Sequence, residues 1–231
     1  MKTHPARDAA WIAGLGDKLA RAGFCLLGQF APAPDDAVPG ARAGHAARAV
    51  LVVGSLSNPL FEIFGTSPEA IDGLPDPLDR FTRRVLTGLA GSEGLGIVFP
   101  FDGPPYHPFQ RWTLKAGGFS RSPMGVLAHR EFGPWTGLRA ALLSPEPMAV
   151  PESLPEQGPC PTCSNTPCMS ACPAGALSQT EYDVPRCLAY LRANPAAPCH
   201  AGCIARRACP FGRAHAQSEE ACSFHMRAFL G

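Results

Sequence analysis

Nine of the ten cysteines lie between residues 160 and 222, and only Cys25 precedes them. The nine are Cys160, Cys163, Cys168, Cys172, Cys187, Cys199, Cys203, Cys209 and Cys222. The same segment is poor in aliphatic periodicity, so burial of apolar side chains cannot hold it together unaided. A small domain of this kind needs additional stabilisation, either by disulfide cross-links or by bound metal. The cysteines therefore predict a separate C-terminal domain built around bound metal or cross-links.

The spacing of the cysteines indicates which kind of metal or cross-link they form. One set runs Cys160-x2-Cys163-x4-Cys168-x3-Cys172-Pro, and the other runs Cys187, then Cys199-x3-Cys203-x5-Cys209-Pro. Eight thiolates match the requirement of two [4Fe–4S] clusters at four each. Each set ends in Cys-Pro with a glycine two residues after the proline, and proline turns the chain away after the ligand. This repeated ending favours iron–sulfur clusters.

Two other chemistries use the same residues. Two structural zinc ions would also take eight thiolates, and Cys-x2-Cys is a zinc-knuckle spacing. Disulfides or free thiols are the third alternative. The N-terminal 24 residues contain no uninterrupted apolar segment of a secretory signal, so we expect a cytoplasmic protein with reduced thiols. Cys25 and Cys222 are interpreted as structural, with Cys222 as a candidate substitute ligand.

Composition excludes several classes of partner. Hydrophobic residues make up 45% of the 231 residues, which suffices for a packed core. The net charge is only +1, so there is no basic field to capture DNA, and no apolar run is long enough to span a membrane. We expect a redox partner protein rather than a nucleic acid, and the sequence predicts no oligomeric state.

The first 153 residues predict an α+β layered domain. Expected helices cover 6–22, 58–65 and 76–91, and expected strands cover 49–55, 95–100, 124–129 and 136–144. The last two strands are predicted to form an antiparallel pair joined by REFGPW, and residues 100–112 to form a loop. A five-proline linker at 144–159 separates domain 1–153 from domain 154–231, in which a short helix is expected near 184–192.

The C-terminal cysteines carry a resemblance to a known family. Residues 160–210, including DVPRCLAYL at 183–191, resemble the double-cluster ferredoxin domain of epoxyqueuosine reductase and of corrinoid reductive dehalogenases. The resemblance implies that Cys160, Cys163, Cys168 and Cys209 hold one cluster, and that Cys172, Cys187, Cys199 and Cys203 hold the other. The sequence departs from that family by two extra residues after Cys163 and by longer gaps before Cys203 and Cys209.

The N-terminal domain has a second likeness. DPLDRFTRRVL (76–86) and residues 125–155 resemble the CblC-type cobalamin-processing chaperone, and HREFGPW (129–135) is the best matching motif. That resemblance implies a nitroreductase-like fold that binds cobalamin in a cleft without a protein lower ligand. The acidic general acid of the epoxide reductase is missing, because PYHPFQRW (105–112) stands in its place. Overall the chain is also similar to small bacterial ferredoxins.

These likenesses suggest both a function and a candidate cofactor site. The candidates for contact with a cofactor are His129, Tyr106, His107, Arg111 and Trp135. A strand-end histidine satisfied by backbone, and a loop that packs its own aromatics, are the bland alternatives. We expect electron transfer through two [4Fe–4S] clusters to a ligand or partner at the N-terminal domain. The alternative is a corrinoid-dependent reductase or cobalamin-processing protein, and a purely structural role for the clusters is a third.

Overall fold

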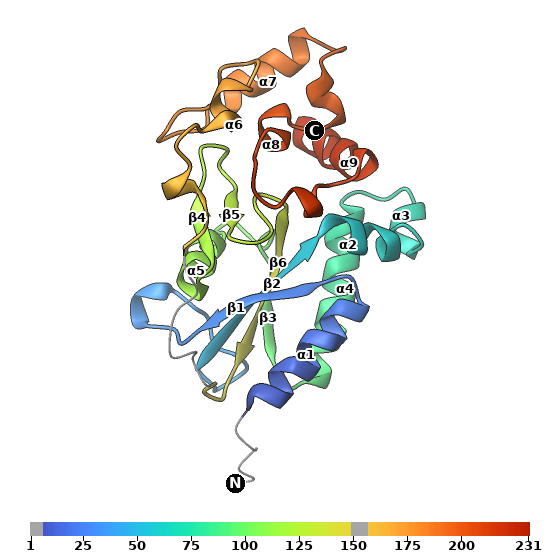
Figure 1. Cartoon of the computed structure of the whole chain (residues 1–231). Coiled ribbons are helices and arrows are strands. Elements are labelled where there is room, and N and C mark those ends of the chain that lie inside the picture. The colour runs from blue at the N-terminus through green and yellow to red at the C-terminus, as the bar shows by residue number, and fades with distance from the viewer. Residues whose placement is uncertain (1–6, 149–156) are drawn as a thin grey trace. The chain divides into compact units, whose positions relative to one another are not determined.

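The chain is described by a computed structural model that covers residues 7–148 and 157–231 (Figure 1). The described residues form two compact units. The first unit contains 7–117 and 137–148, and the second contains 118–136 and 157–231. The predicted domain boundary between 153 and 154 lies outside the described residues. Residues 118–136, which the sequence assigned to the first domain, belong to the second unit.

The first unit is built on a four-stranded sheet in the order β1-β2-β6-β3. The strands are β1 (Cys25–Phe30), β2 (Ala49–Leu56), β3 (Gly96–Val98) and β6 (Thr136–Ser144). β1 pairs antiparallel with β2, with a bulge between Leu26 and Gly28, and β3 pairs antiparallel with β6. The expected strands at 49–55 and 95–100 are confirmed as β2 and β3. β1 was not predicted.

Helices cover this sheet. They are α1 (Ala9–Arg21), α2 (Ser57–Phe64), α3 (Pro68–Ile71), α4 (Pro77–Ser92) and α5 (Phe109–Ala116), with the 3-10 turn η1 (Pro34–Asp36). In Figure 1, α1, α2 and α4 lie to one side of the sheet and α5 to the other. Asp8 accepts a hydrogen bond from the backbone N–H of Trp11 at 2.9 Å and so starts α1. The three predicted helices are confirmed within two or three residues.

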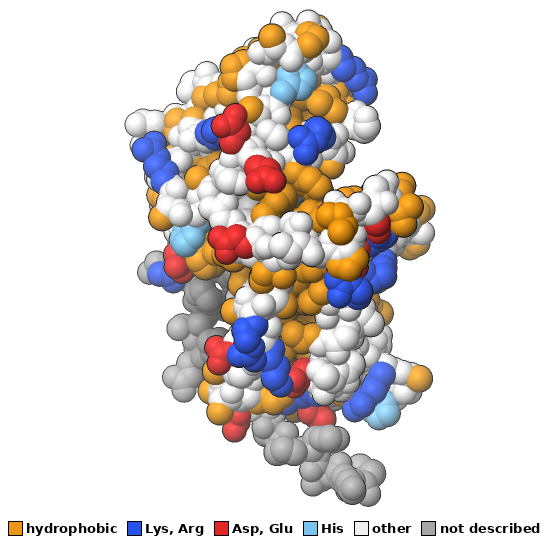
Figure 2. Space-filling view, turned by 90° about the vertical axis from the view of Figure 1, so that its right-hand side faces the viewer, with side chains coloured by type: hydrophobic (Ala, Val, Ile, Leu, Met, Phe, Trp, Pro, Cys, Tyr) orange, Lys and Arg blue, Asp and Glu red, His pale blue; other side chains and the backbone are white. Residues whose placement is uncertain are grey.

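Aliphatic packing holds the first unit together. Val50, Leu51, Val52 and Val53 on β2 are 0% exposed, as are Leu60, Leu86 and Leu142 on other elements. Such a continuous apolar run is typical of a strand buried on both faces. Among the described residues, no helix is long and apolar enough to cross a bilayer. Figure 2 shows Lys and Arg interspersed with Asp and Glu on the face in view.

The predicted antiparallel pair of 124–129 with 136–144 is wrong. Residues 127–129 form β5 (Leu127–His129), which pairs with β4 (Phe119–Arg121) in the second unit. β6 instead pairs with β3 and neighbours β2 in the first unit. The physical reason is burial: Ala140 to Ser144 are all buried, which suits the interior of a sheet and not a two-stranded hairpin.

The second unit consists of short elements. Besides β4 and β5 they are η2 (Cys160–Thr162), α6 (Pro167–Ser170), α7 (Val184–Ala193), η3 (Pro198–Ala201), α8 (Ile204–Arg207), η4 (Arg213–His215) and α9 (Glu219–Leu230). The expected helix near 184–192 is confirmed as α7, which Asp183 caps through the backbone N–H of Arg186 at 2.9 Å. One core cluster of the second unit consists of three buried residues, Met124, Cys168 and Ala205. Four partly buried residues pack against it: Met169, Cys172, Leu177 and Cys203.

Candidate functional site

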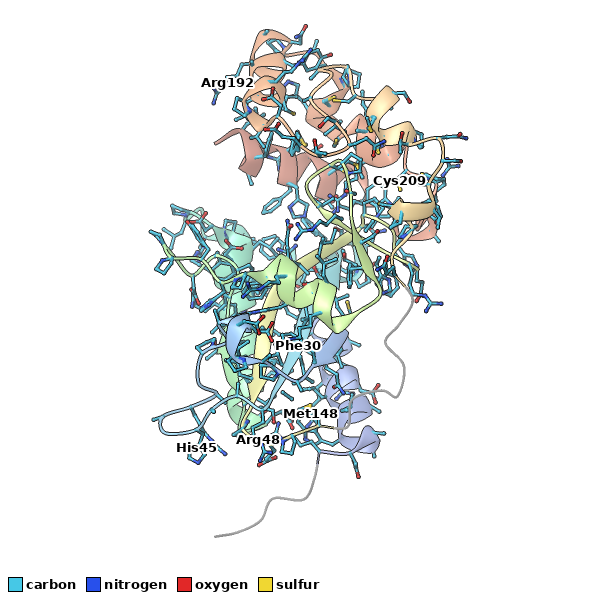
Figure 3. The ribbon with its side chains drawn as sticks, turned by 90° about the vertical axis from the view of Figure 1, so that its left-hand side faces the viewer. Phe30, His45, Arg48, Met148, Arg192 and Cys209 are labelled. Atoms are coloured by element: carbon cyan, nitrogen blue, oxygen red, sulfur yellow. The ribbon has the colours of Figure 1, made fainter. Side chains whose placement is uncertain are left out.

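Four cysteines of the second unit form a set that we call the first thiol group: Cys160, Cys163, Cys168 and Cys209. Burial raises the pKa of Cys160, and the charges of Cys209 and Cys163 raise it further. Burial likewise raises the pKa of Cys168, with added contributions from Cys209 and Cys160. Charges act on one another's pKa over short distances, so these thiols are neighbours although 49 residues separate the first from the last. Figure 3 marks Cys209 beside the pale ribbons of η2 and α6.

The other four cysteines form the second thiol group: Cys172, Cys187, Cys199 and Cys203. Burial raises the pKa of Cys199, and the charges of Cys187 and Cys172 add to it. Burial raises the pKa of Cys203 as well, with Cys199 and Cys187 adding to the shift. All four residues line one cavity of about 330 Å³. A water molecule needs only about 10–15 Å³ on the same measure, so this cavity has room for a group of several atoms.

Each of two short helices connects a cysteine of one group to a cysteine of the other. α6 carries Cys168 of the first group and ends just before Cys172 of the second. α8 starts just after Cys203 of the second group and ends just before Cys209 of the first. The two helices pack against each other, with Ala205 of α8 and Cys168 of α6 in one apolar cluster. Each thiol group therefore draws on both halves of the cysteine sequence.

The repeated Cys-Pro-x-Gly ending has a backbone cause. Gly175 has φ +57° and Gly212 has φ +66°, the left-handed region that glycine adopts without strain. At Gly212 an added Cβ would lie 2.2 Å from the carbonyl carbon and oxygen of Phe132. The chain therefore turns sharply after Cys172 and after Cys209. The second turn presses directly on the backbone that follows β5.

The β4–β5 hairpin supports the first thiol group. Ser120 on β4 accepts a hydrogen bond from the backbone N–H of Cys160 at 3.1 Å, and its hydroxyl lowers the pKa of the Cys160 thiol against the effect of burial. An added Cβ at Gly158 would lie 2.1 Å from the carbonyl oxygen of Ala128. This close approach explains why 118–136 belongs with the cysteines. Sequence reasoning did not single out Ser120, because an isolated serine in a strand carries no pattern.

Tyr182 completes the lining of the second thiol group. Its side chain borders the cavity, and its hydroxyl is hydrogen bonded to Cys187. Burial raises the pKa of Tyr182, and the bond to Cys187 and the nearby charges of Cys203 and Cys172 raise it further. A bridge between Tyr182 and Leu177 fixes the backbone there. No sequence signal pointed to this tyrosine.

Arg206 lies at the same cavity. Its Nε donates to the carbonyl oxygen of Pro134 at 2.8 Å and its Nη1 to Oε1 of Gln217 at 3.2 Å. Its guanidinium carbon lies 5.0 Å from the centre of the Trp135 ring. Burial lowers the pKa of Arg206, while the charges of Cys222 and Cys203 oppose that shift. Arg207, in contrast, is exposed and donates to the carbonyl oxygen of Ala201.

The five predicted cofactor residues divide between the two units. In the second unit, Nδ1 of His129 accepts from the backbone N–H groups of Glu131 and Phe132, both at 3.2 Å, so Nε2 carries the proton of the neutral ring. Its ring stacks on Phe132 at 4.5 Å, and burial lowers the pKa of His129. Trp135 is 2% exposed and forms the surface under Arg206.

The other three predicted residues belong to the first unit. Tyr106 is 65% exposed, and the His107 ring stacks on Trp112 at 5.5 Å. Nη2 of Arg111 donates to the carbonyl oxygen of Asp35 at 2.9 Å. Residues 109–112 are helical rather than loop, because they begin α5. Nε1 of Trp112 bonds the carbonyl oxygen of Asp36 at 2.8 Å, so this segment does pack its own aromatics and anchors η1.

The remaining two cysteines do not line the cavity of the second thiol group. Cys222 on α9 is 5% exposed, with its Sγ 3.6 Å from Oε1 of Gln217. Cys25 begins β1, and burial raises its pKa to about 11. Across residues 7–148 and 157–231, no group of three or more His, Cys, Asp or Glu side chains is spaced to hold a single metal ion.

Comparison with known proteins identifies the fold. No family model matches the sequence, and no curated protein matches it. A solved structure of a B12-trafficking protein, CblC from C. elegans, described as a homologue of human MMACHC, is similar at a TM-score of 0.55 and 16% identity. The match covers 96% of this chain and 92% of that one. The chain thus has a CblC-like fold, while the likeness to double-cluster ferredoxins stays a prediction from the cysteine pattern.

Proposed function

We propose that the chain is a cobalamin-processing protein. The observation that carries this proposal is the structural likeness to a B12-trafficking protein over nearly the full length of both chains. The HREFGPW segment, where the sequence resemblance is strongest, supports it, because this segment forms the ordered turn of His129 with Gly133 and the surface of Trp135 under Arg206. In this proposal the alternative function predicted from the sequence takes precedence over a simple electron carrier.

The experiment is uptake of hydroxocobalamin by the purified full-length protein, followed by absorption spectroscopy. We expect binding near one corrinoid per chain with a base-off change in the spectrum. Protein that takes up no corrinoid at concentrations of about 100 μM would reject the proposal, since affinities weaker than this are of order 5 kcal/mol and below those of specific sites.

A variant pair tests the part played by His129. His129→Ala removes both ring nitrogens, and so it also loosens the turn that Nδ1 holds. His129→Asn keeps an acceptor near the Nδ1 position and loses the Nε2 donor together with the ring that stacks on Phe132. If Nε2 donates to the corrinoid, both variants weaken uptake by about tenfold. If uptake falls only in His129→Ala, the residue acts through the turn.

A second function is favoured by a separate observation, the two groups of four thiols. We propose that each group binds a [4Fe–4S] cluster, the first through Cys160, Cys163, Cys168 and Cys209 and the second through Cys172, Cys187, Cys199 and Cys203. The residues fit such a group, because the four thiols of the second group line one cavity too large for a single ion and each group joins both halves of the cysteine sequence. Bound clusters would supply one-electron transfer, and a bound corrinoid would be its natural acceptor.

The chain's own residues then have defined tasks. The raised pKa values of Cys160, Cys168, Cys199, Cys203 and Cys209 mean that these thiols hold their protons until metal binds, so assembly releases protons. Anaerobic reconstitution should yield about eight irons and eight sulfides per chain. Stoichiometric zinc without acid-labile sulfide would reject the iron–sulfur proposal and leave the corrinoid proposal standing.

A further inference from the structure

We infer that the two clusters differ in reduction potential, and that Arg206 gives the higher potential to the cluster in the second thiol group. This inference rests on the proposed iron–sulfur function. It concerns which cluster an incoming electron occupies. The polar groups that surround the two sets of thiols determine the order.

The two thiol groups are matched in hydroxyl donors. The hydroxyl of Ser120 is hydrogen bonded to Cys160 in the first group. The hydroxyl of Tyr182 is hydrogen bonded to Cys187 in the second. Hydrogen bonds to cluster sulfurs raise the potential, because they stabilise the more negative reduced state. With one such hydroxyl on each side, this effect raises both potentials and does not separate them.

The groups differ in the arginine whose charge acts on their thiols. Arg206 lines the cavity of the second group, and two hydrogen bonds and the Trp135 ring fix its guanidinium there. Among the described residues, no carboxylate forms an ion pair with it. Arginine keeps its charge in proteins, so a fixed positive charge stands beside the place where the second cluster would sit.

The first group has a weaker counterpart. The charge of Arg213 acts on Cys209, but Arg213 is exposed. Water and salt screen an exposed charge several times more strongly than a charge under protein. Reduction adds one negative charge to a cluster, and the less screened cation stabilises that charge more. The second cluster is therefore reduced first.

The test is a redox titration of the reconstituted full-length protein, followed by electron paramagnetic resonance. Wild type should show two midpoint potentials. In Arg206→Gln we expect the reduction equilibrium of the higher-potential cluster to fall at least tenfold, which is about 59 mV for a one-electron couple. The reduction equilibrium constant of the lower-potential cluster should change less than threefold. Arg213→Gln is the matched control, and it should change the reduction equilibrium constant of the lower-potential cluster by less than threefold.

Two conservative variants assign each signal to its thiol group. Tyr182→Phe should lower the potential of the second cluster alone, and Ser120→Ala that of the first alone. Arg206→Lys keeps the charge while losing the planar contact with Trp135, so it should restore most of the potential lost in Arg206→Gln. Restoration by lysine separates an electrostatic role from a purely structural one.

The outcomes are distinguishable. If both clusters assemble in Arg206→Gln and neither potential moves, or both move equally, the inference is wrong and the iron–sulfur function stands. If the signal lowered by Tyr182→Phe is the lower-potential one in wild type, the order is reversed and the inference is also wrong. Wild-type protein that assembles no clusters would overturn the proposed function and this inference with it.

Discussion

The two units reach a stable fold by different means. In the first unit, four consecutive valine and leucine residues of β2 are fully buried, and Leu60, Leu86 and Leu142 join them at 0% exposure. In the second unit, one described cluster of buried apolar residues contains Met124, Cys168 and Ala205, with two further cysteines packed at its edge. Larger side chains such as Trp135 and Leu191 are buried in this unit as well. Apolar burial contributes about 25 cal/mol per Å², and the first unit has more fully buried aliphatic side chains than the second.

With the proposed clusters bound, the cysteines would have a structural task as well as a redox one. The helices α6 and α8, which lie next to ligand candidates of both thiol groups, have only four residues each, too short to be stable in isolation. Free energy of metal binding becomes free energy of folding when the unfolded chain has no preformed site. The second unit should therefore depend on the proposed clusters for its stability, whereas the first should not.

Metal removal is the strongest test of this contrast. After anaerobic removal of iron with a chelator, we expect amides of α6 and α8 to lose protection from hydrogen exchange by several orders of magnitude. Amides of β2 should keep theirs, because their burial involves no metal ligand. Metal binding contributes on the order of 10 kcal/mol in small metal-dependent domains, more than such a unit can supply by packing. Equal protection of both units after chelation would contradict the contrast.

The next largest effect is expected from Cys209→Ser. Cys209 belongs with Cys160, Cys163 and Cys168, far upstream, so its loss should damage that cluster while the second group keeps its iron. Iron analysis should fall from about eight to about four per chain. Retained Cys199 and Cys203 should not rescue the damaged cluster. Loss of the cluster at Cys172 with the first intact would show that the grouping is wrong.

Cys222→Ser is the matched control for that variant. Cys222 is buried like Cys209 and lies in the same unit, but its sulfur faces Gln217. We expect the full iron content and both spectroscopic signals to remain. A halved iron content would make Cys222 a ligand, as the sequence allows.

The reciprocal test weakens the first unit. Leu142 on β6 is 0% exposed and pairs in register with Ile97. Leu142→Ala should cost about 3 kcal/mol of unfolding free energy, the usual range for a buried leucine. Iron content and cluster absorption should be unchanged, since none of the eight proposed ligand thiols lies in this unit. Denaturation in urea and iron analysis of the same sample check both statements.

The sequence anticipates the two units unequally. Helices such as α1 and α4 follow from apolar periodicity and caps, and β2 from its unbroken run of apolar residues. The grouping of thiols follows from resemblance rather than from spacing. β1 escaped prediction because its burial does not alternate, and the bulge at Leu26 breaks the period of two.

Two partners of the site escaped prediction for another reason. Ser120 and Tyr182 reach the thiols through chain reversals that leave no local pattern. Arg206 and Arg207 both stand between Cys203 and Cys209 and are candidates to offset cluster charge, but the sequence does not show that only Arg207 is exposed. The strand pairing of 124–129 was mistaken because proximity in sequence outweighed the burial of β6. Long-range packing decides all of these positions, and a single sequence does not display it.

The smallest expected effect concerns Cys25, the one cysteine of the first unit. Burial raises its pKa from 9.0 to about 11, against the opposing backbone N–H of Leu56. Between these values the folded state keeps a proton that the unfolded chain releases, so stability falls as pH rises from about 9 to about 11 and is unaffected below that window. The loss should reach about 1–2 kcal/mol after allowance for partial exposure. The unfolding free energy of the cluster-loaded protein, obtained from urea denaturation at successive pH values, should fall in wild type across this window. In Cys25→Ala the fall should be smaller by about the same amount. Because the ligating thiols carry metal in these samples, their own titration does not contribute. Identical slopes in the two proteins would mean that the Cys25 thiol is hydrated, and that the first unit is less tightly packed at β1 than the contrast with the second unit requires.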